Sequence, residues 1–159
     1  MLAAREALEL TRSMIESFLT PSSNAIPERA VHAEYIAIVC MLRAIGHVLI
    51  ADCDKAPLNV YLKARWGTWG QDPIFKTYIK PTRDDLLKEF KGRRQLPADD
   101  GASPRIYASP EPITVWHFDP ERLRDEGGRL VAPYFRQSLQ FWQRAVSDIE
   151  AEAGRLGLS

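Results

Sequence analysis

The sequence predicts a mainly α-helical protein: a helical bundle of about five helices, with a short β-hairpin before the C-terminal helix. Two observations lead to this prediction. Long stretches of strong helix formers carry apolar residues at steps of three and four, and β-branched and aromatic residues outside these helical patterns occur in the short segments 105–109 and 113–118. A chain of 159 residues has a common single-domain size, so we expect one helical domain over residues 1–159.

The first two helices are predicted at residues 2–19 and from about residue 27 to 53, separated by a turn-forming segment. In the first, one face is formed by Ala7, Leu10, Met14 and Phe18. The second carries a heptad pattern that indicates a buried face: Val31, Tyr35, Ile38, Leu42, Ile45 and Leu49. Because Ile36, Cys40 and Ile50 line its opposite side, we expect this helix to be apolar nearly all round and central in the bundle.

Three shorter helical segments are predicted next. Residues 56–69 form the first, and Asp72-Pro73 is typical of the start of another, in which Ile74, Phe75 and Tyr78 point inward. Pro81 should break or kink that helix. Thr82 then resembles the cap of a further helix, whose apolar residues are Leu86, Leu87 and Phe90.

The chain changes character after residue 91. Residues 92–112 are rich in Pro, Gly, Ser and charge, which predicts a long surface loop. Segments 105–109 and 113–118 favour the β-hairpin. Asp119 should cap a short helix that Gly127-Gly128 interrupts, and an amphipathic C-terminal helix should follow from residue 129 to about 154. Its predicted buried face is Val131, Phe135, Ser138, Trp142, Ala145, Ile149 and Ala153.

Composition narrows the classes of function. The 21 basic and 21 acidic side chains balance, so any binding of nucleic acid has to depend on a local patch. The charged N-terminal segment does not resemble a secretory signal, and we expect a cytoplasmic protein with reduced cysteines. Arg43 and His47 interrupt the longest apolar stretch, which favours a core helix over a membrane span. The three His and two Cys lack metal-ligand spacing, so we expect neither metal nor cofactor.

Arg43 and His47 are the candidate catalytic residues. Their spacing of four places both side chains on one side of a helix. A guanidinium that holds phosphate beside an imidazole that moves a proton is the minimum for metal-independent RNA cleavage. The alternative is structural, because a partly buried Arg commonly pairs with a carboxylate such as Asp84, Asp85 or Glu89.

Trp66 and Trp69 are candidate binding residues, because basic residues lie close to them in the sequence. Rings interleaved with Lys and Arg can bind single-stranded nucleic acid by stacking and by charge. In the alternative interpretation the rings fill the space between two short helices while the lysines stay in solvent. The sequence leaves both interpretations open.

The segment RWGTWGQDPIFKTYIKPTRDDLLKEF, together with the upstream R-A-I-G-H, resembles a group of bacterial helical proteins of unassigned function, and through them the HEPN superfamily of toxin and antiviral modules. The resemblance implies that active members use an Arg, a following polar residue and a His four to six residues after the Arg. Arg83 and Asp84 match the first two positions, but Lys88 stands where the His would be. These three residues are therefore candidates for binding.

The resemblance favours a non-catalytic HEPN-like module in a toxin–antitoxin or defence context. Its expected partner is another protein or a second copy of the chain, without a membrane. A metal-independent ribonuclease or toxin that uses Arg43 and His47 is one alternative. A single-stranded nucleic-acid binder, with RNA as its partner, is the other.

Overall fold

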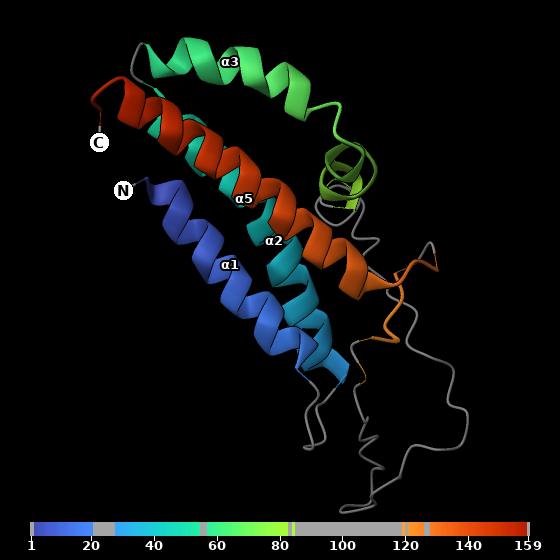
Figure 1. Ribbon diagram of the computed structural model, residues 1–159. Coiled ribbons are helices and arrows are strands. Elements are labelled where there is room, and N and C mark those ends of the chain that lie inside the picture. The colour runs from blue at the N-terminus through green and yellow to red at the C-terminus, as the bar shows by residue number, and fades with distance from the viewer. Residues whose placement is uncertain are drawn as a thin grey trace, which may run out of the picture.

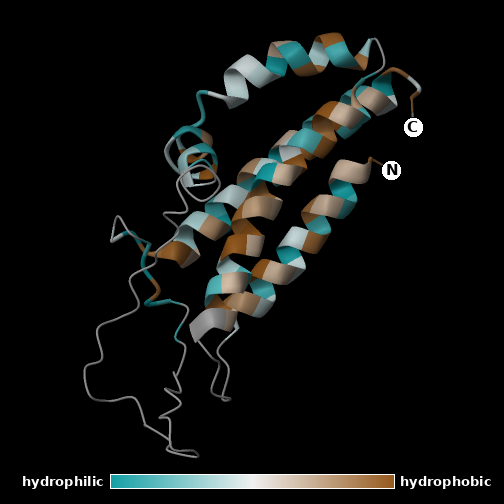
Figure 2. Ribbon diagram, turned by 180° about the vertical axis from the view of Figure 1, so that it is seen from behind, coloured by the Kyte–Doolittle hydropathy of each residue, from teal (hydrophilic) through white to brown (hydrophobic). Residues whose placement is uncertain are grey.

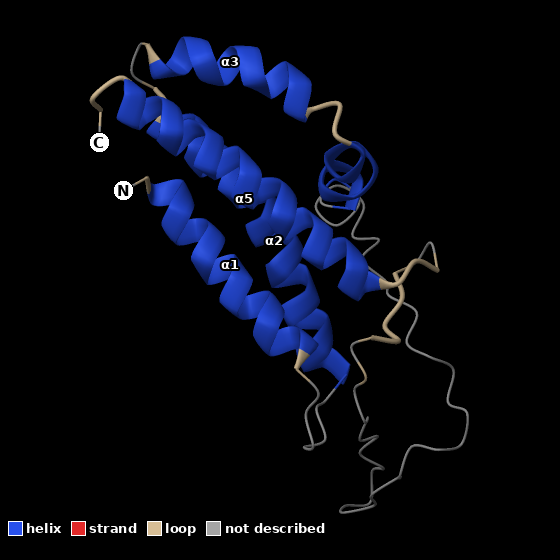
Figure 3. Cartoon of the chain, viewed as in Figure 1, coloured by secondary structure: helices blue, strands red, loops and turns tan. Residues whose placement is uncertain are grey.

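The computed structural model describes residues 2–20, 28–54, 57–82, 84, 119, 121–125 and 128–158. Five helical elements lie in this part of the chain (Figure 1): α1 Ala3–Leu19, α2 Glu28–Asp52, α3 Leu58–Trp69, the π-helix η1 Phe75–Ile79, and α5 Val131–Arg155. The prediction of a mainly α-helical protein is confirmed. The described residues contain no strand (Figure 3), only an isolated antiparallel bridge between Arg124 and Leu130. The expected hairpin and the loop 92–112 lie outside them.

Helices α1, α2 and α5 form the bundle, and α2 and α5 both run antiparallel to α1 (Figure 1). At one end the backbone N–H of Ala4 donates to the Asp52 carboxylate at 2.7 Å. Near the other end the rings of Phe18 and Phe135 meet edge to face, with 5.8 Å between their centroids. Helix α3 packs along α5, and η1 contacts both α2 and α5. One face of α2 is therefore covered by α1, α5 and η1.

The buried faces of α2 and α5 agree with the predicted patterns. All six heptad positions of α2 and all seven predicted positions of α5 are buried. In α1 the predicted face is confirmed only in part: Phe18 is buried and Ala7 and Met14 pack against the core, but Leu10 is 56% exposed. The fully buried face is Ala4, Leu8, Thr11, Ile15 and Phe18. Both sets follow steps of three and four, so spacing alone did not choose between them. Contact with α2 and α5 selects the set that contains Leu8 and Ile15.

Helix α2 is apolar nearly all round and contacts α1, α5 and η1, but its second side is only partly covered. Ile36 and Cys40 are half-buried, and Ile50 is 41% exposed. The physical reason is the position of α3, which packs on α5 and leaves the second side of α2 open. An apolar side of a helix is buried only where another element is available to cover it.

Asp72 begins the next helical segment as predicted, because its Oδ1 accepts the backbone N–H of Ile74 at 3.0 Å. The chain then widens into η1, in which the N–H of Lys80 donates to the carbonyl of Phe75. Pro81 does not end this segment, since helical conformation continues to residue 82. Proline cannot bond the carbonyl four residues earlier. That carbonyl, on Thr77, accepts Nη1 of Arg129 at 3.2 Å instead.

The short helix expected after Asp119 is absent from the described residues 121–125. Asp119 caps a turn by accepting the N–H of Glu121 at 3.0 Å, but the chain then enters the antiparallel bridge. Gly128, with φ of 74°, allows the reversal of direction. The buried carboxylate of Asp125 accepts both the backbone N–H of Arg129, at 2.9 Å, and its Nε, at 2.7 Å. This compact turn leads directly into α5.

Candidate functional site along α2

Arg43 lies in a corner between α2, α3, η1 and α5 that Gly46 makes possible. A Cβ at Gly46 would lie 2.6 Å from Cη2 of Trp142 and 3.2 Å from Cη2 of Trp66. Nη1 of Arg43 also reaches within 3.2 Å of that point. The Arg43 guanidinium carbon stands 5.8 Å from the ring centroid of Phe75, and its Nε and Nη1 are buried. The Arg43 cation is thus packed among aromatic rings.

The aromatic residues of this corner form one continuous cluster. Trp66 meets Trp69 and Phe75 edge to face, with 6.2 Å between centroids in each pair. Phe75 connects this cluster to the core, because its ring centroid lies 5.5 Å from that of Phe141 and 6.0 Å from that of Trp142. Trp66 and Trp69 are half-buried, and Lys63 and Lys76 are exposed. Trp66 joins α3 to η1 through Phe75, and Trp69 packs against Trp66, as in the space-filling interpretation considered from the sequence.

The other candidate residues that the structure describes differ from Arg43 in their exposure. His47 lies one helical turn from Arg43 but is exposed. Arg43 and Trp66, predicted separately as catalytic and binding residues, come together over Gly46. Asp84 is half-buried, while Arg83 and Lys88 lie outside the described residues. Among the described residues no group of three His, Cys, Asp or Glu side chains could hold a metal ion.

The two cysteines differ in their environment. Cys40 lies on α2 and is half-buried. Cys53, directly after α2, is fully buried, and burial together with the charge of Asp52 raises the pKa of its thiol to about 11. A thiol that keeps its proton is a poor nucleophile. Cys53 therefore has the properties of a packing residue.

The open side of α2 is a feature that motif analysis did not detect. Because successive residues of a helix are rotated by about 100°, the side chains of this open side fall within one arc of α2. We call it the outer face of α2, and it consists of Ala33, Ala37, Cys40, Met41, Ala44, His47, Val48 and Ala51. Figure 2 shows hydrophobic colours along α2 from behind. All of these residues are exposed or half-buried, and His47 is the only ionisable side chain among them apart from the Cys40 thiol.

Helix α2 is also unusually apolar for a helix with an open side. The segment Ala30–Asp52 has a mean hydropathy of 1.7 over an 18-residue window, of which 39% is buried. By length and composition alone it is the one helix among the described residues that could cross a membrane. A sequence signal for the open face existed in Ala30, Ala37, Ala44 and Ala51, which recur every seven residues beside the heptad of larger side chains.

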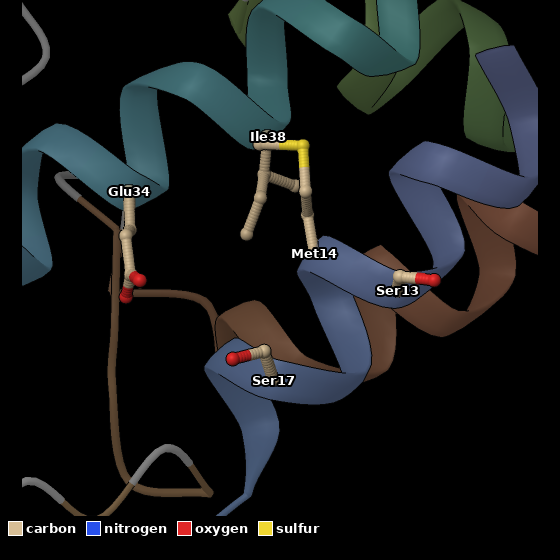
Figure 4. A pocket seen from close by; sticks show the side chains of 5 residues that line it. All are labelled: Ser13, Met14, Ser17, Glu34 and Ile38. Carbon is tan, nitrogen blue, oxygen red and sulfur yellow. The ribbon is translucent and has the colours of Figure 1, made fainter.

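A pocket of about 280 Å³ borders the outer face, where α1 meets α2 (Figure 4). Its lining residues are Ser13, Met14 and Ser17 from α1, and Glu34 and Ile38 from α2. Figure 4 shows the side chains of Met14 and Ile38 meeting, with the carboxylate of Glu34 and the hydroxyl of Ser17 on the same side of that pair. Glu34 is exposed and forms no ion pair with another described residue.

The described residues thus form a mainly α-helical fold with an arginine packed against aromatic rings, an open apolar helix face and an adjoining pocket that contains Glu34. No protein-family model, curated protein or solved structure matches the chain.

Proposed function

We propose that the chain is a non-catalytic, HEPN-like helical module that binds a protein partner through the outer face of α2, in a toxin–antitoxin or defence context. The observation that carries this proposal is the open side of α2. This helix is apolar, yet only 39% of its most apolar 18-residue window is buried. Contiguous apolar surface on a soluble domain commonly marks an interaction site, because covering it removes apolar area from water.

The position of Arg43 supports a non-catalytic role. A guanidinium that binds phosphate has to present its N–H groups to the ligand. In Arg43, Nε and Nη1 are buried and the group lies over the ring of Phe75. Only His47 of the pair is exposed. The burial of these two guanidinium nitrogens of half-buried Arg43 favours a packing role over phosphate binding.

A protein partner fits the outer face better than a lipid bilayer does. The opposite side of α2 is fully engaged by the bundle, with Val31, Ile38 and Leu49 at most 2% exposed. Insertion of α2 into a membrane would separate these contacts and place Arg43 and His47 near the bilayer centre, where a charged side chain costs about 2.5 kcal/mol or more. A protein can cover the outer face while the bundle stays folded.

Photo-crosslinking in cells tests the proposal. A benzoylphenylalanine at Ala37 should give a discrete product with a partner, whereas the same group at exposed Lys76, on η1, should not. Adding Ala44→Lys to the Ala37 probe should remove the product, because a cation then lies on the apolar contact. A thermal melt checks that each variant is folded. Identical products from both positions, or a product that survives Ala44→Lys, would show that the outer face is not the interface.

RNA cleavage is a second candidate function, and the observation in its favour is that exposed His47 lies one turn from Arg43. Purified protein and a labelled RNA in chelator test it. Cleavage that disappears in His47→Ala would establish the ribonuclease and reject the non-catalytic proposal. A titration of the same RNA at low and high salt tests the binding alternative at Trp66 and Trp69, which requires salt-sensitive affinity.

A further inference from the structure

We propose that the pocket between α1 and α2 receives a basic side chain of the protein partner, with an apolar partner residue beside it on α2. This inference rests on the proposed function and adds the chemistry that the partner must present. The pocket consists of Ser13, Met14, Ser17, Glu34 and Ile38.

The shape and lining of the pocket suit a long amphipathic side chain. Its volume of about 280 Å³ lies just below the range of about 300–1,000 Å³ typical of small-molecule sites, so one or two side chains can fill it. Met14, which is half-buried over Ile38, offers an apolar surface to the methylene groups of Lys or Arg. The hydroxyl of Ser17 and the carboxylate of Glu34 lie on one side of that surface, where they can accept N–H donors.

The charge around the pocket is complementary to a cation. Glu34 forms no ion pair with another described residue. Helix α1 contains only two basic residues, and both turn toward α5: Arg5 donates to Glu150, and Arg12 donates to Gln143. Neither of them therefore neutralises Glu34. An arginine from a partner could bind the carboxylate and a serine hydroxyl together, because its guanidinium carries five donors.

The pocket is continuous with the outer face of α2. Ala37 and Met41 follow Glu34 by three and seven residues and lie on the same side of the helix. On α1, Leu10 precedes Met14 by one turn and is 56% exposed. An apolar strip thus begins where the acidic pocket ends. A helical partner segment would match both parts with a basic residue and an apolar residue about one turn away.

Peptide binding to the full chain tests this inference. The probes are three alanine-based helical peptides that carry Arg, Gln or Glu at one position and Leu four residues later. Amide chemical shifts of the labelled protein report where each peptide binds. We expect the Arg peptide to shift Ser13, Ser17 and Ile38, and to bind about three- to fivefold more tightly than the Gln peptide, as for an exposed ion pair.

Variants of exposed Glu34 make the test specific, and thermal melts check their folding. Glu34→Gln should remove the preference for Arg, and Glu34→Lys should make the Glu peptide the tighter ligand. Glu16→Gln is the matched control, since Glu16 is exposed on α1 but does not line the pocket, and it should retain the preference. Equal affinities for the three peptides, or an Arg preference that survives Glu34→Gln, would overturn the inference.

The outcomes separate this inference from the proposed function. If all three peptides shift the outer face of α2 equally, the apolar interface stands and the basic-residue pocket is wrong. If no peptide shifts the pocket residues, the inference is also wrong, while photo-crosslinking from Ala37 still decides whether the outer face is an interface. If the peptides distinguish charge at Glu34 but crosslinking finds no partner on the outer face, the proposed function fails and the inference falls with it.

Discussion

Replacement of Gly46 by Ala tests the packing of the aromatic corner, and we expect it to destabilise the protein. In an open helical position this change stabilises by about 0.5–1 kcal/mol, because Ala is the better helix former. At Gly46 the new methyl group would lie 2.6 Å from Cη2 of Trp142, a side chain with no solvent exposure. The rigid indole has little room to move, and overpacking of this kind costs about 1–3 kcal/mol.

The net expected effect of Gly46→Ala is a loss of about 1–2 kcal/mol in the free energy of unfolding. For a chain of 159 residues this corresponds to a fall in Tm of about 2–8 °C. Urea denaturation and thermal melts followed by circular dichroism measure both quantities. Gly67→Ala is the matched control, because Gly67 lies in α3 with no heavy atom within 4 Å of its added Cβ, and it should stabilise by up to about 1 kcal/mol.

A second substitution identifies the neighbour that is responsible. Trp142→Phe removes the atom closest to the added methyl group, so Gly46→Ala should be neutral or stabilising in that background. Stabilisation by Gly46→Ala in the wild-type background, similar to that of Gly67→Ala, would refute the packing of Trp142 against α2.

Three further predictions concern the arginines and the thiols. In urea denaturation, Arg43→Ala should lower the free energy of unfolding by about 1–3 kcal/mol because its guanidinium packs over an aromatic ring, whereas exposed His47→Ala should change it by less than about 0.5 kcal/mol; equal effects would contradict the different environments. A thiol reagent at pH 8 should modify Cys40 in the native protein and Cys53 only on unfolding. The pKa of Cys53 is about 11 in the folded protein, against an ordinary value of 9.0, so between these pH values the unfolded chain loses the thiol proton while the folded protein keeps it. The free energy of unfolding should therefore fall as pH rises from about 9 to 11, and it should fall less in Cys53→Ala. Arg129→Ala should lower the free energy of unfolding by about 2–4 kcal/mol, because it leaves the buried carboxylate of Asp125 without its cation and uncovers the stacked rings of Tyr78 and Tyr134. A loss below about 1 kcal/mol in urea denaturation would contradict this role of Arg129.

The predicted helices differ in how well their orientation could be derived. In α5 the stripe from Val131 to Ala153 contains no charged residue, whereas charged residues such as Arg136 and Arg144 lie outside it, so the pattern favoured one buried face, and that face is confirmed. In α1 two sets of residues have the same spacing, and contact with α2 and α5 selected the one that contains Leu8 and Ile15. Helical periodicity thus predicts the element but leaves its rotation open when two stripes compete.

The candidate site shows the same division. The spacing of Arg43 and His47 correctly places them one turn apart on α2, but it carries no information on burial. Phe75, which lies against the Arg43 guanidinium, and Trp142, which packs against Gly46, come from η1 and α5 and are far away in sequence. The pocket at Glu34 was missed because its lining residues form no motif. The available signal was Glu34, the single carboxylate between Ala30 and Ala51.

Local propensity and periodicity along one chain segment were enough to predict the helical class, the approximate limits of the longer helices and the buried stripes of α2 and α5. These local patterns do not specify which apolar faces are covered. Coverage depends on where other elements pack, and α3 lies on α5, away from the second side of α2. That choice leaves the outer face of α2 open beside Glu34, and it encloses Arg43 among aromatic rings.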